Sequence, residues 1–103
     1  STLSFRDLLL SAKKMMKENS RFALVLPFYE SRLFIKEAEQ LGFYLQKEMH
    51  IIPIEGKDAN RVNMQFILSE VDNVETECLT IRNKDYSYTD EYREFLKDYY
   101  LDF

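Results

Sequence analysis

The sequence predicts a mixed α/β fold, and three observations carry that prediction. Residues 22–27 are apolar at every position, as in a strand with both faces covered in the middle of a sheet. The segments before and after this run carry apolar side chains at helical spacing. Two later segments alternate apolar and polar residues, which is typical of strands with one face exposed. At 103 residues, the chain has the size of one domain.

The first half of the chain predicts a helix, a strand and a second helix. Ser4 and Asp7 resemble a capping box at the start of a helix over residues 4–18. The strand at 22–27 ends at Pro27. A helix over residues 30–41 follows, and Gly42 is placed to stop it.

The second half predicts an antiparallel hairpin, a short edge strand and a last helix. Strands over residues 43–52 and 61–69 are joined by a polar loop that is too short for a helical crossover, so they should pair antiparallel. Residues 78–82 predict the edge strand, with Leu79 and Ile81 facing inward. Thr89 begins the last helix, because a hydroxyl followed by acidic residues is typical of a helix start.

The composition excludes several classes of site. The two glycines lie at positions 42 and 56, too far apart for a glycine-rich phosphate loop. With one cysteine and one histidine, the chain forms no internal disulfide and no Cys/His zinc cluster. The net charge of −4 gives no general attraction to nucleic acid or anionic lipid. The longest apolar run is too short to span a membrane, and a lone thiol favours the cytoplasm.

The candidate functional residues are therefore few, and no catalytic, cofactor-binding or metal-binding residue is predicted. His50 on its alternating strand is interpreted as a surface or packing residue, and Cys78 as buried or inert. Lys57, Asn60 and Arg61, in and beside the hairpin loop, are candidates to contact a substrate or RNA, against the alternative of a solvent-exposed turn.

Two further groups carry the same two-sided interpretation. A basic group at the end of the first helix either reaches toward phosphates or is a solvated helix end. The aromatic residues of the C-terminal stretch either pack the last helix against the sheet or stack on bases. The basic group consists of Lys13, Lys14, Lys17 and Arg21; the aromatic group consists of Tyr86, Tyr88, Tyr92, Phe95, Tyr99, Tyr100 and Phe103.

Several local sequences resemble one bacterial family. The strand at 22–27, the segment 60–66 and the C-terminal segments 79–82, 88–92 and 95–103 are similar to the C-terminal half of the tRNA1(Val) (adenine(37)-N6)-methyltransferases. These are class I S-adenosylmethionine-dependent enzymes with a Rossmann-like sheet. The resemblance implies that 22–27 is the fifth strand of that sheet and that the last strand inserts antiparallel beside it.

The resemblance also implies what this chain lacks. The family binds its cofactor with a glycine-rich loop and an acidic residue, and its target adenine with an Asn-Pro-Pro-Tyr motif, and none of these is present. Residues 1–103 are therefore expected to form a single partial domain, inactive by itself and without bound cofactor. The full-length enzyme would use S-adenosylmethionine and methylate the N6 of an adenine in tRNA.

Two alternatives remain open. One is a stand-alone α/β binding or interaction domain, and the other is a small enzyme whose site assembles only as an oligomer. A partial sheet would also leave the strand at 22–27 with a free edge, so self-association through that edge is expected.

Overall fold

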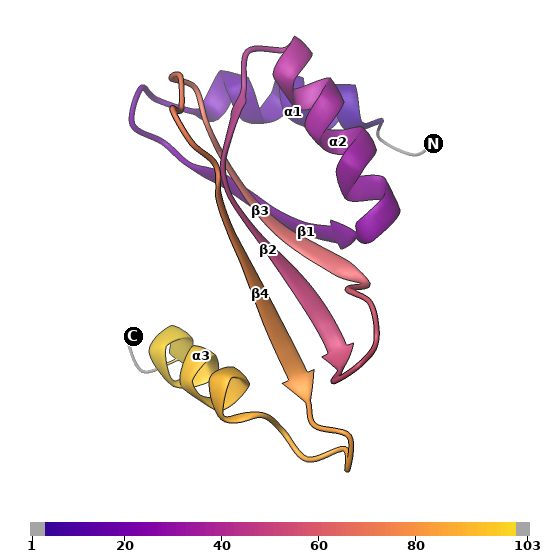
Figure 1. Cartoon of the computed structure of the whole chain (residues 1–103). Coiled ribbons are helices and arrows are strands. Elements are labelled where there is room, and N and C mark those ends of the chain that lie inside the picture. The colour runs from indigo at the N-terminus through magenta and orange to yellow at the C-terminus, as the bar shows by residue number, and fades with distance from the viewer. Residues whose placement is uncertain (1–3, 101–103) are drawn as a thin grey trace.

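The computed structural model describes residues 4–100, and of residues 99 and 100 only the backbone. It confirms the mixed α/β prediction and the predicted order of elements (Figure 1). The elements are α1 (Phe5–Met15), β1 (Phe22–Pro27), α2 (Phe28–Gln40), β2 (Tyr44–Ile54), β3 (Arg61–Ile67), β4 (Glu75–Arg82) and α3 (Asp90–Tyr100).

The four strands form one sheet in the order β1-β3-β2-β4. β3 is antiparallel to both β1 and β2, and β4 is parallel to β2. The predicted hairpin and the predicted insertion of its second strand beside β1 are both confirmed. Because β1, β2 and β4 point the same way, they end at one edge, which we call the carboxyl edge (Figure 1).

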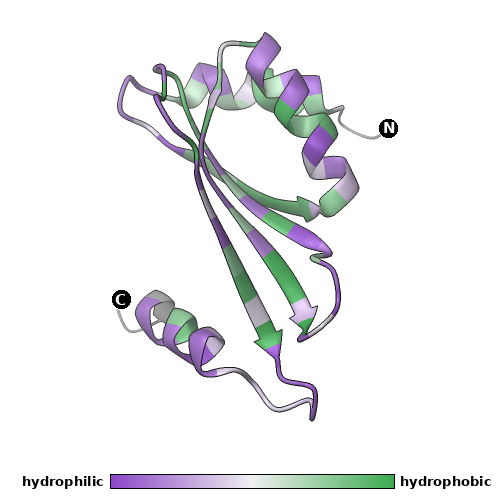
Figure 2. Cartoon of the chain, in the orientation of Figure 1, coloured by the Kyte–Doolittle hydropathy of each residue, from purple (hydrophilic) through white to green (hydrophobic). Residues whose placement is uncertain are grey.

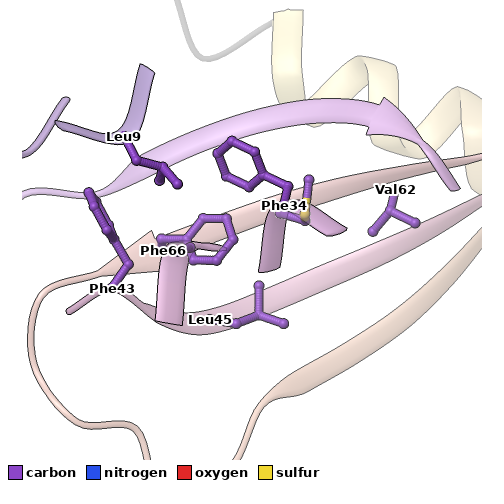
Figure 3. Packing of buried hydrophobic residues seen from close by; sticks show 8 residues of the cluster. Leu9, Phe34, Phe43, Leu45, Val62 and Phe66 are labelled. Carbon is purple, nitrogen blue, oxygen red and sulfur yellow. The ribbon is translucent and has the colours of Figure 1, made fainter. Parts of the chain in front are cut away.

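Helices α1 and α2 cover one face of the sheet and enclose the core. Phe34 of α2 is fully buried, with its ring centroid 5.1 Å from that of Phe5 and 5.6 Å from that of Phe66. Figure 3 shows Phe34 and Phe66 among the buried residues that lie between the helices and the strands. The buried cluster consists of Leu9, Phe34, Ala38, Phe43, Leu45, Val62, Met64 and Phe66.

The prediction that β1 is covered on both faces is wrong. Exposure alternates along the strand, and Val25 on the open face is 49% exposed although β1 is apolar throughout (Figure 2). The reason is topological: α1 and α2 both lie on the other face, and β3 pairs with one side of β1 only. Within residues 4–100, β1 is an edge strand.

The helix boundaries differ from the predicted ones by one to three residues. α1 ends at Met15 because Met16 adopts an extended backbone, with φ −84° and ψ 138°. α2 begins at Phe28, directly after β1. Gly42 stops α2 as predicted, with a φ of +88° that side chains disfavour.

The strands β2 and β4 are longer than predicted because they pair with each other. β2 continues through Pro53 to Ile54, which lies opposite Arg82. β4 starts at Glu75, opposite Lys47, and is the edge strand that was expected. Its inward residue Leu79 is buried.

Candidate functional site

The carboxyl edge gathers the start of α2 and two loops. The β2–β3 loop (residues 55–60) is tied to α2, because the Phe28 N–H donates to the Asn60 carbonyl over 3.0 Å. The same loop is tied to the end of β4, because the Glu55 N–H donates to the Arg82 carbonyl over 2.8 Å. In sheets with parallel strands flanked by helices, ligands bind at this kind of edge.

The structure brings Lys57, Asn60 and Arg61 together at the carboxyl edge. All three are exposed, and their side chains make no hydrogen bond or ion pair within the described residues. Arg61 is the first residue of β3 and lies opposite Pro27 in the ladder. The three residues are thus available to a ligand beside the start of α2, and contact with RNA stays a prediction.

A buried carboxylate lies on β2, on the side that α2 covers. The side chain of Glu48 on β2 is 9% exposed, and its Oε1 accepts a hydrogen bond from Arg32 Nη2 over 3.1 Å. The same oxygen bonds to His50 Nε2. Phe28 closes the group: its ring lies 5.3 Å from the His50 ring and 5.0 Å from the Arg32 guanidinium carbon. We call Phe28, Arg32, Glu48 and His50 the Glu48 cluster.

The Glu48 cluster is built to keep its carboxylate charged. Burial acts to raise the pKa of Glu48, but the hydrogen bonds from His50 and Arg32 outweigh burial, and the pKa is lowered. A carboxylate in this state is a poor proton donor near neutral pH. Its effect is to hold Arg32 and His50 in fixed positions, which agrees with the interpretation of His50 as a packing residue.

Cys78 does not form a nucleophilic pair with His50. The two residues lie opposite each other in the β2–β4 ladder, yet no hydrogen bond joins them in the described part of the chain. Cys78, interpreted above as buried or inert, is exposed, so burial is ruled out and inertness stays a prediction. The reason is that β4 is an edge strand, and α1 and α2 cover other strands.

Among the residues whose side chains the structure describes, no group of histidine, cysteine and acidic side chains could hold a metal ion. Over the same part of the chain, no helix is long and apolar enough to cross a membrane.

The residues of the basic group at the end of α1 differ in their contacts. Lys13 Nζ donates to the Leu41 carbonyl over 2.7 Å, so this lysine joins α1 to the end of α2. Lys14, Lys17 and Arg21 are exposed. Lys13 therefore joins two helices, and for the other three residues both interpretations, a solvated helix end or contact with phosphates, stay predictions.

The C-terminal aromatic residues also divide. Tyr88 contacts Tyr92 with ring centroids 5.3 Å apart, and the Arg82 guanidinium lies 4.3 Å from the Tyr88 ring. Phe95 of α3 faces the open side of the sheet across a hollow of about 200 Å³. Packing therefore explains part of this group; Phe103 lies outside the described residues, as do the side chains of Tyr99 and Tyr100.

The charged side chain that lines the hollow under α3, Lys47, forms ion pairs with two acidic residues. Lys47 Nζ lies 3.0 Å from Glu75 Oε2 and 3.7 Å from Glu77 Oε2. The hydrogen bond to Glu75 raises the pKa of Lys47. This hollow has less to offer an anionic ligand than the carboxyl edge, where Lys57 and Arg61 are unpaired among the described residues.

The comparison with solved structures concerns the fold. Over 91% of its length the chain has the fold of part of a predicted O-methyltransferase, protein Atu636 from Agrobacterium tumefaciens, with a TM-score of 0.72. The match covers 44% of that protein at 17% sequence identity. The sheet, with an antiparallel strand inserted beside a strand–helix unit, therefore has a fold that is also found in part of that protein.

The comparison of sequences adds named relatives. The chain is similar to tRNA1(Val) (adenine(37)-N6)-methyltransferases: 30% identical over 99 residues to that of Trichodesmium erythraeum, and 31% identical over 101 residues to that of Actinobacillus pleuropneumoniae serotype 7. These matches cover 96% and 98% of this chain but 41% and 42% of the relatives, so the chain spans about two-fifths of their length. No protein-family model matches. The resemblance predicted from the motifs is confirmed.

Proposed function

We propose that residues 1–103 are part of an S-adenosylmethionine-dependent methyltransferase that methylates the N6 of an adenine in tRNA. The observation that carries the proposal is the similarity to tRNA adenine-N6 methyltransferases over 96% of the chain. The shared sheet topology supports it. On this proposal the chain is a partial domain, and a tRNA substrate places the enzyme in the cytoplasm.

The described residues do not fit a binding site for S-adenosylmethionine. Neither glycine opens a helix: Gly42 ends α2, and Gly56 turns the chain between β2 and β3. We therefore propose that cofactor binding and methyl transfer depend on sequence beyond these residues, and that the 103-residue chain is inactive alone.

The chain's own contribution to the reaction would be to position the RNA. An enzyme that modifies a base must take it out of the stack and hold the reacting nitrogen in line with the methyl carbon. Lys57, Asn60 and Arg61 stand at the carboxyl edge, where such a nucleotide would be held. Their part is to contact the phosphates or base edges of the tRNA.

Methyl transfer by the longest polypeptide encoded in frame with this sequence tests the proposal. Incubated with labelled S-adenosylmethionine and tRNA, it should incorporate label into RNA, and mass spectrometry of the digested RNA should find N6-methyladenosine. Label in protein or a small molecule instead would refute the substrate. Calorimetry on the 103-residue chain should detect no cofactor binding; binding would favour a small enzyme that assembles as an oligomer.

The alternative of a stand-alone interaction domain has its own discriminating observation. A start codon directly before Ser1 in the coding sequence would favour that alternative. An in-frame glycine-rich loop and Asn-Pro-Pro-Tyr motif upstream would favour the methyltransferase.

For the isolated chain we also propose self-association through β1. The strand has six uncharged residues, it pairs with β3 on one side only within the described residues, and Val25 is 49% exposed. A free apolar strand edge is a template for pairing with a second copy. Size-exclusion chromatography with light scattering should find a dimer or larger species at micromolar concentration, and Val25→Lys should shift it to monomer. A monomeric unmodified chain would contradict the idea.

A further inference from the structure

Tyr29 is an unusual side chain at the carboxyl edge. It is the second residue of α2 and is 71% exposed, and its side chain makes no hydrogen bond or ring contact within residues 4–100. Side chains on a helix lean toward the helix N-terminus. Because α2 starts at the end of β1, Tyr29 leans out over the carboxyl edge.

Arg32 stands one turn further along α2 on the same side of the helix. Its guanidinium group is held between the Phe28 ring, 5.0 Å away, and the Glu48 carboxylate, 3.1 Å away. Its side chain is still 38% exposed. A partly exposed, planar cation is therefore held in place on the side of the helix that carries the exposed Tyr29.

The β2–β3 loop supplies free cations beside this pair. The bond from the Phe28 N–H to the Asn60 carbonyl fixes the loop against the start of α2. Lys57 and Arg61 are exposed there. Acidic residues are also near: Glu30 follows Tyr29 in the sequence, and Glu55 and Asp58 lie in the same loop. The edge thus has little net charge, and a ligand must be held mainly by stacking.

We propose that Tyr29 and Arg32 form a stacking surface for an unpaired nucleotide of RNA, with Lys57 and Arg61 on its phosphates. The inference rests on the proposed function and names a part of this chain that would read the substrate. Proteins that recognise RNA loops stack splayed bases on aromatic rings and guanidinium planes, whereas bases inside a duplex are not available. The surface therefore selects loops over paired stems.

Fluorescence anisotropy with the 103-residue chain and a labelled stem–loop RNA tests the stacking surface. Loss of one stacked base weakens binding by about 5- to 150-fold, and Tyr29→Ala is expected to fall in this range. Tyr29→Phe keeps the ring and should bind like the unmodified chain. Tyr44→Ala is the matched control, because Tyr44 is 37% exposed but begins β2 at the opposite edge of the sheet. Circular dichroism of each variant checks that the fold is kept.

The salt dependence separates stacking from charge. With two phosphate contacts, the logarithm of the binding constant should fall with the logarithm of salt concentration with a slope of about −1.4, and Lys57→Ala should reduce the slope by about 0.7. A fully paired RNA of the same length should compete poorly.

Three results would each overturn the stacking surface. The first is that a folded Tyr29→Ala variant binds as tightly as the unmodified chain. The others are that the paired RNA competes as well as the stem–loop, or that the stem–loop does not bind. None of these results touches methyl transfer by the longer polypeptide, so the two proposals fail separately.

Discussion

Replacing Glu48 by glutamine tests whether the Glu48 cluster stabilises the fold through charge. Glutamine has nearly the same shape and keeps an acceptor oxygen, so the change removes the negative charge and little else. Arg32 and His50 would then face a neutral amide in place of the carboxylate. The free energy of unfolding should fall.

The magnitude follows from the exposure of the partners. Hydrogen bonds to charged groups contribute about 1.5–3 kcal/mol each, and breaking a fully buried ion pair costs about 3–5 kcal/mol. Here the partners are only partly buried, with 38% of the Arg32 side chain and 22% of the His50 side chain exposed, so water replaces part of what is lost. We expect a loss of about 1–3 kcal/mol. With a denaturant slope of about 1.5 kcal/mol/M, the urea midpoint would fall by about 0.7–2 M.

The pH dependence gives the sharper test. The pKa of Glu48 is lower in the folded chain than its ordinary value of 4.5. Its charge therefore stabilises the fold fully at pH values above 4.5, and this contribution is lost as the pH falls through the lowered pKa. The difference between the unmodified chain and Glu48→Gln should be large at pH 7 and shrink in acid.

A matched control is Glu77→Gln, on the neighbouring strand. Glu77 is 47% exposed and faces Lys47 across 3.7 Å, so its removal should cost less than about 1 kcal/mol. The reasoning fails if the Glu48→Gln difference is unchanged between pH 7 and acid, or if Glu77→Gln costs as much.

Two further substitutions test the packing and the turns. Phe34→Ala removes a ring that is fully buried among Phe5, Phe22 and Phe66, and should lower the free energy of unfolding by about 3–5 kcal/mol in urea titrations, whereas Leu33→Ala, 42% exposed, should stay within about 0.5 kcal/mol. Gly42→Ala and Gly56→Ala both strain a positive φ, at about 1–2 kcal/mol each. Gly42→Ala should cost more, because its Cβ would lie 3.1 Å from Lys13 Nζ and disturb the bond from that atom to Leu41; equal melting temperatures for the two variants would contradict this.

The order of elements could be predicted from sequence because its signals are local. Periodicity distinguished helix from strand, and Ser4 marks the start of α1 by accepting a hydrogen bond from the Asp7 N–H. The faces of β2 could not be predicted this way. Strict alternation puts Leu45 and Glu48 on opposite faces, but a bulge between Leu45 and Lys47 adds one residue and turns both toward the helices.

The candidate site was only partly accessible from sequence. The position of Lys57, Asn60 and Arg61 beside a hairpin turn follows from loop length. Their contact with the start of α2 does not, because it depends on β3 pairing with β1. The Arg32–Glu48 pair joins a helix to a strand across 16 positions, and no local pattern signals it.

The wrong prediction for β1 is itself informative about the open face of the sheet. On that face β1 presents Ala23 and Val25, whereas the neighbouring β3 presents Asn63 and Gln65. In a strand with one face in solvent, apolar residues on the buried face alternate with polar residues on the exposed face. The apolar residues on the open face of β1 do not fit such a strand. They fit a strand that is covered by other residues at the free edge of the sheet. If other residues cover that edge, the exposure of Val25 should fall first, and exposure would no longer alternate along β1. Asn63 and Gln65 on β3 should stay closer to solvent. Hydrogen exchange on the 103-residue chain and on the longer in-frame polypeptide can compare these positions directly. Protection of β1 that rises in the longer polypeptide would support the partial-domain proposal, and protection that is equal in both would count against it.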